Sequence, residues 1–299
     1  MVRIDGAAVF SMSAEHLPAV TVKSGETITF VTRDCYNNVK RDDTPELRSL
    51  GWDEINPATG PVYVEGAVQG DVLRIQIERI RVADSGVMVA IPGEGVLGKM
   101  VKKGVVKRIP VQDGMALFSE DIRIPCEPMI GVIGVAPPHG AIPCGEPGCH
   151  GGNMDNSRIR EGATLYLPVF HEGGLLAMGD VHACMGDGEV MCSGLEIPAE
   201  VTVTVDVMKG ISIKNPMMED AESFYTIASD VDLERAIFLA VSDMAKLVMR
   251  KKNMSLEDAG MLLSAMGNLQ FCQVVDPKRT VRMQLKKSVL DGFDPGMFA

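Results

Sequence analysis

The chain has 299 residues, which is enough for one large domain or for two to three smaller ones with buried cores. Its net charge is −11 and no lysine and arginine cluster spreads over a face, which argues against nucleic acids and anionic membranes as partners. No apolar run approaches the roughly 20 residues of a membrane span, and the first residues do not resemble a signal peptide. We therefore expect a cytoplasmic protein whose seven cysteines are free thiols.

Strand patterns follow one another through the first two thirds of the chain. Residues 20–32 and 60–80 each read as a strand, a glycine turn and a second strand, and residues 201–207 and 281–285 also alternate apolar and polar side chains. Residues 130–136, "IGVIGVA", are apolar throughout and indicate a strand buried on both faces. Residues 139–155 are rich in glycine, and a loop of that length is usually functional.

Helical patterns appear only near the end of the chain. Residues 230–249 have apolar side chains at spacings of three and four after an acidic start, and Ser255 begins a second, shorter helix that ends near Gly267. The prediction is a β-rich α+β protein. Its β-sandwich-like body over residues 1–215 carries the active site, and a smaller helical α+β portion with a returning strand follows over residues 216–299.

Several catalytic signatures are missing from the sequence. It contains no G-x-S-x-G elbow, no Walker loop, no G-x-G-x-x-G after a strand and no H-E-x-x-H motif. Cys144 and Cys149 are separated by four residues, not by the two that a zinc ribbon requires. These absences argue against serine hydrolases of the elbow type, nucleotide-dependent enzymes and zinc fingers.

The stretch "MGDVHACMGDGE" (178–189) gathers carboxylates, an imidazole and glycines. It predicts a hairpin with a turn at residues 186–188. If the loop has an even number of residues, Asp180, His182 and Glu189 share one face and could bind a divalent metal; an odd number scatters them. Asp187 is either a turn residue or a catalytic carboxylate. From these residues alone, a surface turn and a metal site are both open.

Two other polar stretches are similar in character. In "TRDCYNN" (32–38), Asp34 is either a metal ligand or a cap for the following residues, and Cys35 is either a nucleophile or a small buried apolar side chain. In "CHGGNMDNS" (149–157), His150, Asn153 and Asp155 accompany two glycines that allow a ligand to approach the backbone closely. A surface turn is the alternative for the second stretch.

The sequence resembles the acetamidase/formamidase family in residues 56–77, 130–137, 151–156, 162–190 and 272–285. The resemblance implies hydrolysis of a short aliphatic amide such as formamide or acetamide, a homodimer or larger assembly, and a bound divalent metal, zinc or calcium. Most of the candidate residues match the family pattern, whereas the position of His150 varies within the family. The matched polar positions are Asp34, Asn153, Asp155, Asp180, His182, Asp187 and Glu189.

These positions suggest a division of labour. We expect Asp34, Asp180 and His182 as metal ligands, Glu189 as a ligand or the general base, and Asp155 and His150 as support for the ligands or as ligands of a second metal. Asn153, or a backbone N–H near Gly151 and Gly152, would complete an oxyanion hole, and Asp187 is a further catalytic candidate whose alternative role is to shape the turn. One alternative is the same reaction with the Cys35 thiolate as nucleophile. The other is a non-catalytic β domain that binds a structural metal or another ligand.

Overall fold

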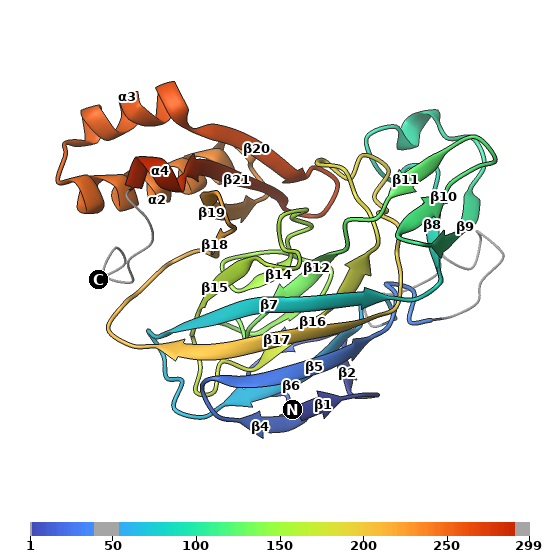
Figure 1. Ribbon diagram of the computed structural model, residues 1–299, viewed down its shortest axis with the longest axis horizontal. Coiled ribbons are helices and arrows are strands. Elements are labelled where there is room, and N and C mark those ends of the chain that lie inside the picture. Colours follow the sequence, from blue (N-terminus) through green and yellow to red (C-terminus); the bar gives the residue numbers. More distant parts are fainter. Residues whose placement is uncertain (1, 39–53, 291–299) are drawn as a thin grey trace.

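The computed structural model describes residues 2–38 and 54–290, and its body consists of two β-sheets packed face to face (Figure 1). Nine strands form the larger sheet, which contains both early and late parts of the chain. In spatial order they are β1 (Val2–Ile4), β5 (Glu26–Thr32), β17 (Ala199–Met208), β7 (Val72–Val82), β15 (Thr164–Pro168), β18 (Met217–Glu219), β19 (Ser223–Asp230), β21 (Arg279–Lys286) and β20 (Asn268–Gln273).

The second sheet has six strands and carries Asn153, Asp180 and His182, three of the polar residues discussed below. Its strands are β14 (Gly151–Asn153), β12 (Met129–Gly134), β16 (Leu176–His182), β6 (Ala58–Val64) and β2 (Ala8–Val9), with β4 (Val20–Val22) also paired to β6. Two smaller sheets complete the β structure: β11 (Arg123–Pro125), β10 (Met115–Leu117), β9 (Val105–Gln112) and β8 (Ser85–Ala90) form one, and β13 (Ala141–Pro143) and β3 (Ser11–Ser13) form the other. A 3₁₀ turn, η1, spans Gly98–Met100.

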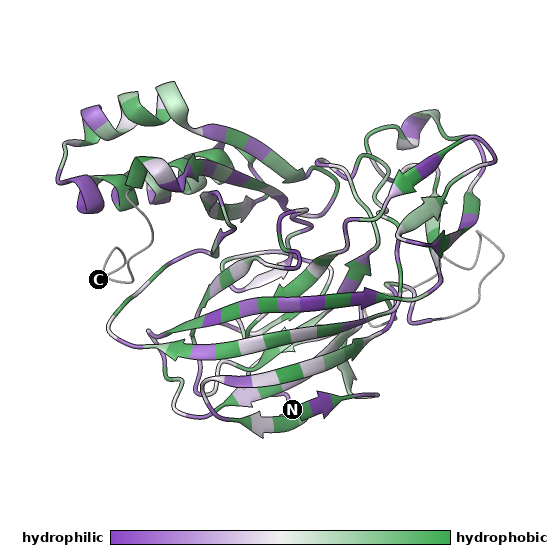
Figure 2. Cartoon of the chain, in the orientation of Figure 1, coloured by the Kyte–Doolittle hydropathy of each residue, from purple (hydrophilic) through white to green (hydrophobic). Residues whose placement is uncertain are grey.

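Alternating side chains explain why the two large sheets pack together. Along β17, Val201, Val203 and Val205 are buried while the residues between them are partly exposed, and the alternation is visible along the strands of the larger sheet (Figure 2). The main hydrophobic cluster joins these valines to Val62 and Ile133 of the six-stranded sheet. The predicted β-sandwich-like body is confirmed, and so are the strands expected in residues 20–32, 60–80, 201–207 and 281–285.

Strand β12 is buried on both faces, as its uninterrupted apolar sequence predicts. It lies between β14 and β16, both antiparallel to it. The glycine-rich segment 139–155 is not one continuous loop, because it contributes β13 and β14. Its second strand therefore brings Gly151–Asn153 directly beside β12.

The C-terminal portion has α2 (Leu233–Lys252), α3 (Leu256–Met266) and α4 (Lys287–Leu290). The side chains of Asp232 and Ser255 cap the first two helices, and Ser255 is the residue at which the sequence predicts the second helix to begin. Strands β18 and β19 precede the helices and were not predicted. Because β18 pairs with β15, the larger sheet continues from residues 1–215 into residues 216–299 (Figure 1). Within the described residues, no helix combines the length and the apolar character that a bilayer crossing requires.

Candidate functional site

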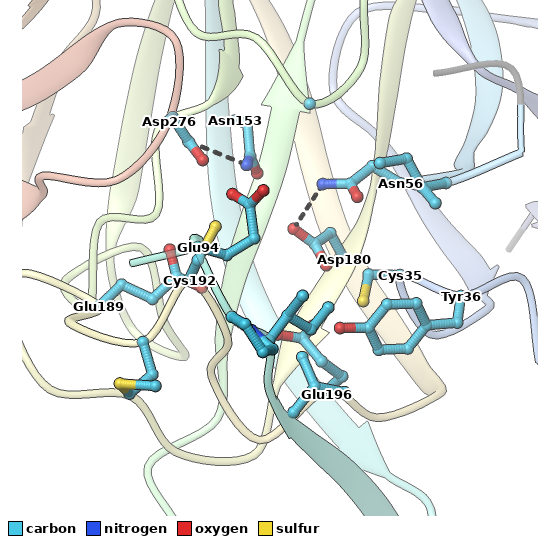
Figure 3. A pocket seen from close by; sticks show the side chains of 16 residues that line it. Cys35, Tyr36, Asn56, Glu94, Asn153, Asp180, Glu189, Cys192, Glu196 and Asp276 are labelled. Atoms are coloured by element: carbon cyan, nitrogen blue, oxygen red, sulfur yellow. Dashed lines mark hydrogen bonds between the residues drawn. The ribbon is translucent and has the colours of Figure 1, made fainter. Parts of the chain in front are cut away.

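A cavity of about 550 Å³ opens where β14, β16 and the turn after β20 come together (Figure 3). Four of the carboxylates that line it are buried, and Ile55, Val89, Ile91 and Pro92 form apolar parts of its wall. The polar side chains that line it are those of Cys35, Tyr36, Asn56, Glu94, Asn153, Asp180, Glu189, Cys192, Glu196 and Asp276.

Gly131 of β12 makes room for two of the carboxylates. A Cβ atom at this position would lie 2.5 Å from Oδ1 of Asp155 and 2.9 Å from Oδ2 of Asp180. Any other residue at position 131 would push at least one carboxylate away. The glycine in "IGVIGVA" therefore allows Asp155 and Asp180 to approach each other across the strand.

Three acidic residues of this site have left-handed backbone conformations. The φ angles are 41° at Asp155, 51° at Asp180 and 45° at Glu189. Residues other than glycine rarely adopt this region, and such strain persists only where surrounding structure imposes it, often at functional sites. These backbone conformations direct the carboxylates of three separate chain segments towards the same small region of the site.

His182 lies at the centre of the carboxylates. Its Nε2 atom is 3.0 Å from Oε2 of Glu196, 3.6 Å from Oδ1 of Asp180 and 3.9 Å from Oδ1 of Asp155. Two sets of side chains each bring three potential ligand atoms within 4.8 Å of one another. Asp155, His182 and Glu189 form one set, and Cys35, Asp180 and Glu196 form the other.

Burial dominates the electrostatics of this cluster. It raises the pKa of Asp155 and Glu189 well above the usual range, and the Glu189 carboxylate adds to the effect on Asp155. Burial raises the pKa of Glu196 to about 7, with a further contribution from Asp180 that the nearby His182 opposes. For His182, burial acts to lower the pKa, but Glu196 and Asp180 outweigh it and raise the value well above normal. Without a cation, these side chains therefore tend to hold protons.

The cluster fits a divalent cation. Both carboxylate oxygens of Asp155, both ring nitrogens of His182, Oδ1 of Asp180 and Oε2 of Glu196 are buried and have no hydrogen-bond partner in the described part of the chain. The contact between His182 and Glu196 lacks hydrogen-bond geometry despite its short distance. Buried polar atoms without partners are costly. A cation coordinated by carboxylates and one imidazole would satisfy them, and zinc or calcium suits such a donor set.

Four of the residues singled out from the sequence come together here, namely Asp155, Asp180, His182 and Glu189. Asp34 is a member of neither ligand set, and its Oδ1 accepts hydrogen bonds from the backbone N–H groups of Tyr36 and Asn38 and so caps a turn. This is the capping alternative that the sequence left open.

The remaining candidates occupy different environments. Asn153 lines the cavity and donates from Nδ2 to Oδ2 of Asp276 at 3.0 Å. His150 is fully buried, and its ring lies against Gly148 and Gly152, outside both ligand sets. Asp187 also lies outside them and forms an ion pair with Arg282.

The predicted hairpin in residues 178–189 is wrong. Strand β16 ends at His182, and the chain returns to pair with it only at residues 195–197, where the Ile197 N–H donates to the carbonyl of Val181. Glu189 stands in the intervening loop, and its Oε1 accepts a hydrogen bond of 3.1 Å from the N–H of Gly194. Asp180, His182 and Glu189 converge, but loop geometry and not strand register brings Glu189 to the others.

Sequence reasoning missed Glu196, Asp276 and Asn56. Glu196 stands between Leu195 and Ile197 in an otherwise apolar run, and an isolated acid in such a run was the available signal. Asn56 donates from Nδ2 to Oδ2 of Asp180 at 3.2 Å. Asp276 and Asn56 carry no comparable local signal, because only the folded chain brings them to the cavity.

Comparison with known proteins places the chain among amidase relatives. The model of the Acetamidase/Formamidase family matches residues 14–143 and 141–232. An acetamidase from Bacillus halodurans has 41% sequence identity and a TM-score of 0.94, with 97% of this chain and 99% of that one covered. A protein from Thermoanaerobacter tengcongensis, described as a "predicted acetamidase/formamidase", has 45% identity and a TM-score of 0.94, with 99% and 98% covered.

A curated relative from Schizosaccharomyces pombe is 26% identical over 267 residues, which cover 67% of this chain. The chain spans only 64% of the length of that relative. The family match, in contrast, extends over well more than half of the chain. The chain belongs to the Acetamidase/Formamidase family.

Proposed function

We propose that this protein hydrolyses the C–N bond of a short aliphatic amide, of the formamide or acetamide type, to a carboxylate and ammonia with the help of a divalent metal. The observation that carries the proposal is the set of buried, unpartnered ligand atoms around His182, of which those of Asp180 and Glu196 belong to residues that line the cavity. Family membership and the solved relatives named acetamidase support the choice of an amide as substrate.

Amide hydrolysis makes three demands: an activated water, a stabilised oxyanion and a protonated leaving nitrogen. Asp155, Asp180 and His182 would hold the metal, with Glu196 beside His182. A bound divalent ion supplies a water of lowered pKa and polarises the substrate carbonyl. We assign zinc as the first choice of ion and calcium as the second.

Glu189 is the side chain that we assign to proton transfer. Its Oε1 is fixed by the Gly194 N–H, which leaves Oε2 to accept a proton from water and pass it to the departing nitrogen. Burial raises the pKa of this carboxyl, which suits a group that must hold the proton between the two steps.

The sequence led us to expect Asn153 in an oxyanion hole, but we assign it a different role. Its Nδ2 group already donates to Asp276, whereas its Oδ1 is buried and without a hydrogen-bond partner among the described residues. We infer that Oδ1 accepts an N–H group of the substrate amide. This arrangement would favour primary amides over esters, which have no N–H to donate.

The thiol alternative has weaker support. The sulfur atom of Cys35 lies within 4.8 Å of carboxylate oxygens of Asp180 and Glu196. Burial, together with these carboxylates, raises the pKa of the thiol well above normal. A nucleophilic cysteine needs the opposite surroundings, with a base or a positive charge at hand. Arg33, next to it in the sequence, donates instead to Asn37 and to the carbonyl of Gly6.

An ammonia-release assay with formamide, acetamide and propionamide, paired with elemental analysis of the purified protein, tests the proposal. We expect turnover of at least one of these amides by protein that contains about one or more equivalents of a divalent metal. Metal-loaded protein that releases no ammonia would favour a non-catalytic metal-binding domain. Our proposal also includes a homodimer or larger assembly in the cytoplasm, which sedimentation of the purified protein and localisation of the tagged protein would test.

A further inference from the structure

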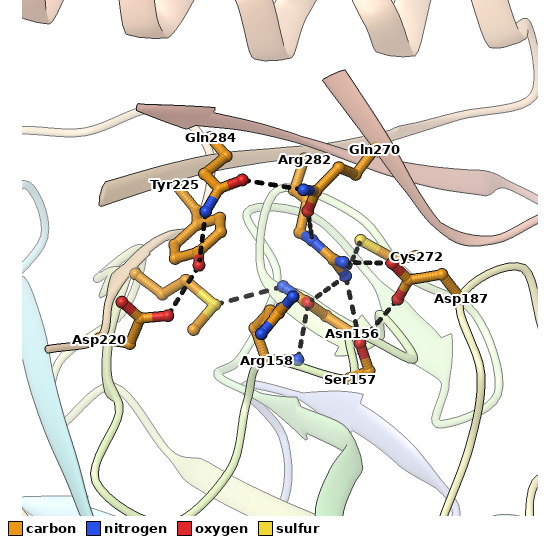
Figure 4. A network of polar contacts seen from close by, with 11 residues as sticks. Asn156, Ser157, Arg158, Asp187, Asp220, Tyr225, Gln270, Cys272, Arg282 and Gln284 are labelled. Carbon is orange, nitrogen blue, oxygen red and sulfur yellow. Dashed lines mark hydrogen bonds and ion pairs between the residues drawn. The ribbon is translucent and has the colours of Figure 1, made fainter. Parts of the chain in front are cut away.

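Arg282 is a fully buried arginine on β21, in the C-terminal portion of the chain. Its guanidinium group donates from Nε to Oε1 of Gln270 at 2.7 Å and from Nη1 to Oδ1 of Asn156 at 2.8 Å. Its Nη2 group donates to Oδ2 of Asp187, with which it forms an ion pair (Figure 4). Ser157 donates to the other oxygen of Asp187 at 2.6 Å.

The partners of Arg282 are chain neighbours of two site carboxylates. Asn156 directly follows Asp155, and Asp187 stands two residues before Glu189. Both Asp155 and Glu189 have left-handed backbone conformations, which need support from their surroundings. Arg282 joins the two segments that carry them, through Asn156 on one side and Asp187 on the other.

Backbone contacts reinforce the same connection. The N–H of Gly188 donates to the carbonyl of Cys272 at 2.7 Å, and the N–H of Val274 donates to the carbonyl of Gly188 at 3.2 Å. The loop that carries Glu189 is therefore attached to the end of β20 by hydrogen bonds on both sides of Gly188. The turn after these residues places Asp276 in the cavity.

The far side of Arg282 is also held in place. Gln270 donates to Gln284 at 2.9 Å, Gln284 donates to the hydroxyl of Tyr225 at 3.2 Å, and Tyr225 donates to Asp220 at 2.7 Å (Figure 4). A guanidinium group is planar and presents its donors in fixed directions. The network thus fixes the position of the group that touches both site segments.

We propose that Arg282 is a positioning residue that holds Asp155 and Glu189 at a fixed separation, through Asn156 and Asp187. In this role Asp187 accepts the hydrogen bond and ion pair from Arg282, and it is not a catalytic group. The inference rests on the proposed function for its catalytic consequence, because the separation matters for turnover only if Glu189 transfers protons next to the metal ligands.

The test compares Arg282→Met and Arg282→Lys with a matched control, Arg74→Met. Arg74 also forms a strand-to-strand ion pair, at 2.9 Å with Asp206, but away from the cavity. We expect Arg282→Met to lower kcat about 100-fold, with KM changed less than threefold, because small misplacements of reacting groups cost about this much. Arg282→Lys should be intermediate, since one ammonium group cannot hold both segments. Arg74→Met should keep the wild-type kcat.

A second measurement separates positioning from general destabilisation. Hydrogen exchange of the backbone amides in residues 186–194 should accelerate in Arg282→Met, whereas exchange in β17 should stay unchanged. Asp187→Asn, a side chain of the same shape, should reproduce both effects, and the double variant should lose no more kcat than the worse single variant. Kcat within threefold of wild type in Arg282→Met, or equal acceleration of exchange in β17, would overturn the inference.

The two proposals fail in different ways. Wild-type protein that releases no ammonia refutes the proposed function, yet hydrogen exchange needs no substrate and still decides whether Arg282 holds the loop. Active wild-type protein with unaffected Arg282 and Asp187 variants refutes the positioning role alone. If Arg282→Met does not fold, Asp187→Asn provides the decision, because 41% of the Asp187 side chain is exposed and its replacement is sterically neutral.

Discussion

Asn153 donates its Nδ2 hydrogen to Oδ2 of Asp276 at 3.0 Å, and both side chains are buried beside the cavity. This bond decides which end of the Asn153 amide remains for a substrate. The NH₂ group of Asn153 is occupied by Asp276, and its Oδ1, which has no hydrogen-bond partner among the described residues, is left as an acceptor.

Replacement of Asn153 by alanine should therefore impair amides more than esters. We expect kcat/KM for acetamide to fall at least about tenfold more than kcat/KM for methyl acetate, which corresponds to the loss of one hydrogen bond worth about 1.4 kcal/mol. Kinetics with both substrates on the wild-type and variant proteins measure the difference. An equal loss for the two substrates would mean that Asn153 does not recognise the amide N–H.

Glu189→Gln should abolish most of the turnover while the protein remains folded. Glutamine keeps the hydrogen bond from Gly194 but cannot carry the proton, so kcat should fall about 10²- to 10⁴-fold. Melting curves should show no loss of thermal stability, since a neutral amide is easier to bury than a carboxylate. Glu200→Gln, at a surface ion pair with Arg3, is the control and should keep its activity. Near-wild-type kcat in Glu189→Gln would remove this residue from the mechanism.

Metal removal should affect both activity and stability. A strong chelator would leave the ligand atoms around His182 without partners, so we expect loss of ammonia release and a lower melting temperature, both restored by added Zn²⁺ or Ca²⁺. Elemental analysis confirms that the treated protein is free of metal. Full turnover by such protein would contradict metal assistance.

Cys35→Ser should retain amide hydrolysis. The thiol is buried beside carboxylates, which raise its pKa and disfavour the thiolate that a nucleophile requires. We expect kcat within about tenfold of wild type, with any loss coming from altered metal affinity. Inactivation of the variant to background, together with rapid labelling of wild-type Cys35 by a thiol reagent and no effect of a chelator, would favour the thiol mechanism instead.

Because His150 resists protonation in the folded protein, we expect the protein to become less stable as the pH falls into the mildly acidic range. Burial, with a contribution from Lys278, lowers the pKa of His150 from 6.5 to about 4. The unfolded chain then binds a proton that the folded chain does not, so stability is lost as the pH falls from about 6.5 towards 4. The loss approaches about 3 kcal/mol at the lower end.

Urea unfolding at pH 7.5 and pH 4.5, with wild-type protein and His150→Leu, isolates this contribution. The wild type should lose about 2–3 kcal/mol more than the variant between the two pH values. An identical pH dependence of the two proteins would show that His150 does not titrate in this way. Loss of metal from His150→Leu would instead support the role in metal binding that the sequence suggested for His150.

The sequence predicted the fold better than the site. Alternation in residues such as Val201 to Val205 reports directly which face is buried, so the strands of the body were predictable. Strands β18 and β19 were missed because β19 is buried over most of its length and shows no alternation, and β18 is only three residues long.

The site was predicted in part because its residues are of two kinds. Asp180 and His182 lie on one strand, where local spacing carries information. Glu189 enters through a loop whose shape depends on Arg282 and on Cys272, both of which are distant in sequence. The assumed hairpin register therefore grouped Asp180, His182 and Glu189 correctly, although a loop and not a paired strand brings Glu189 to the other two. Glu196 and Asp276 reach the cavity only through tertiary pairing, so no local pattern could combine them with the others.

The continuous nine-stranded sheet has a consequence for how this protein acquires activity. Most neighbouring strands in it are distant in the chain, and chains dominated by such non-local pairings fold slowly. Residues from Cys35 to Asp276 must also meet before the cavity exists. The cavity is therefore complete only when the hairpin of β20 and β21, whose turn carries Asp276, has docked on β19. Acquisition of activity is thus coupled to the docking of this hairpin.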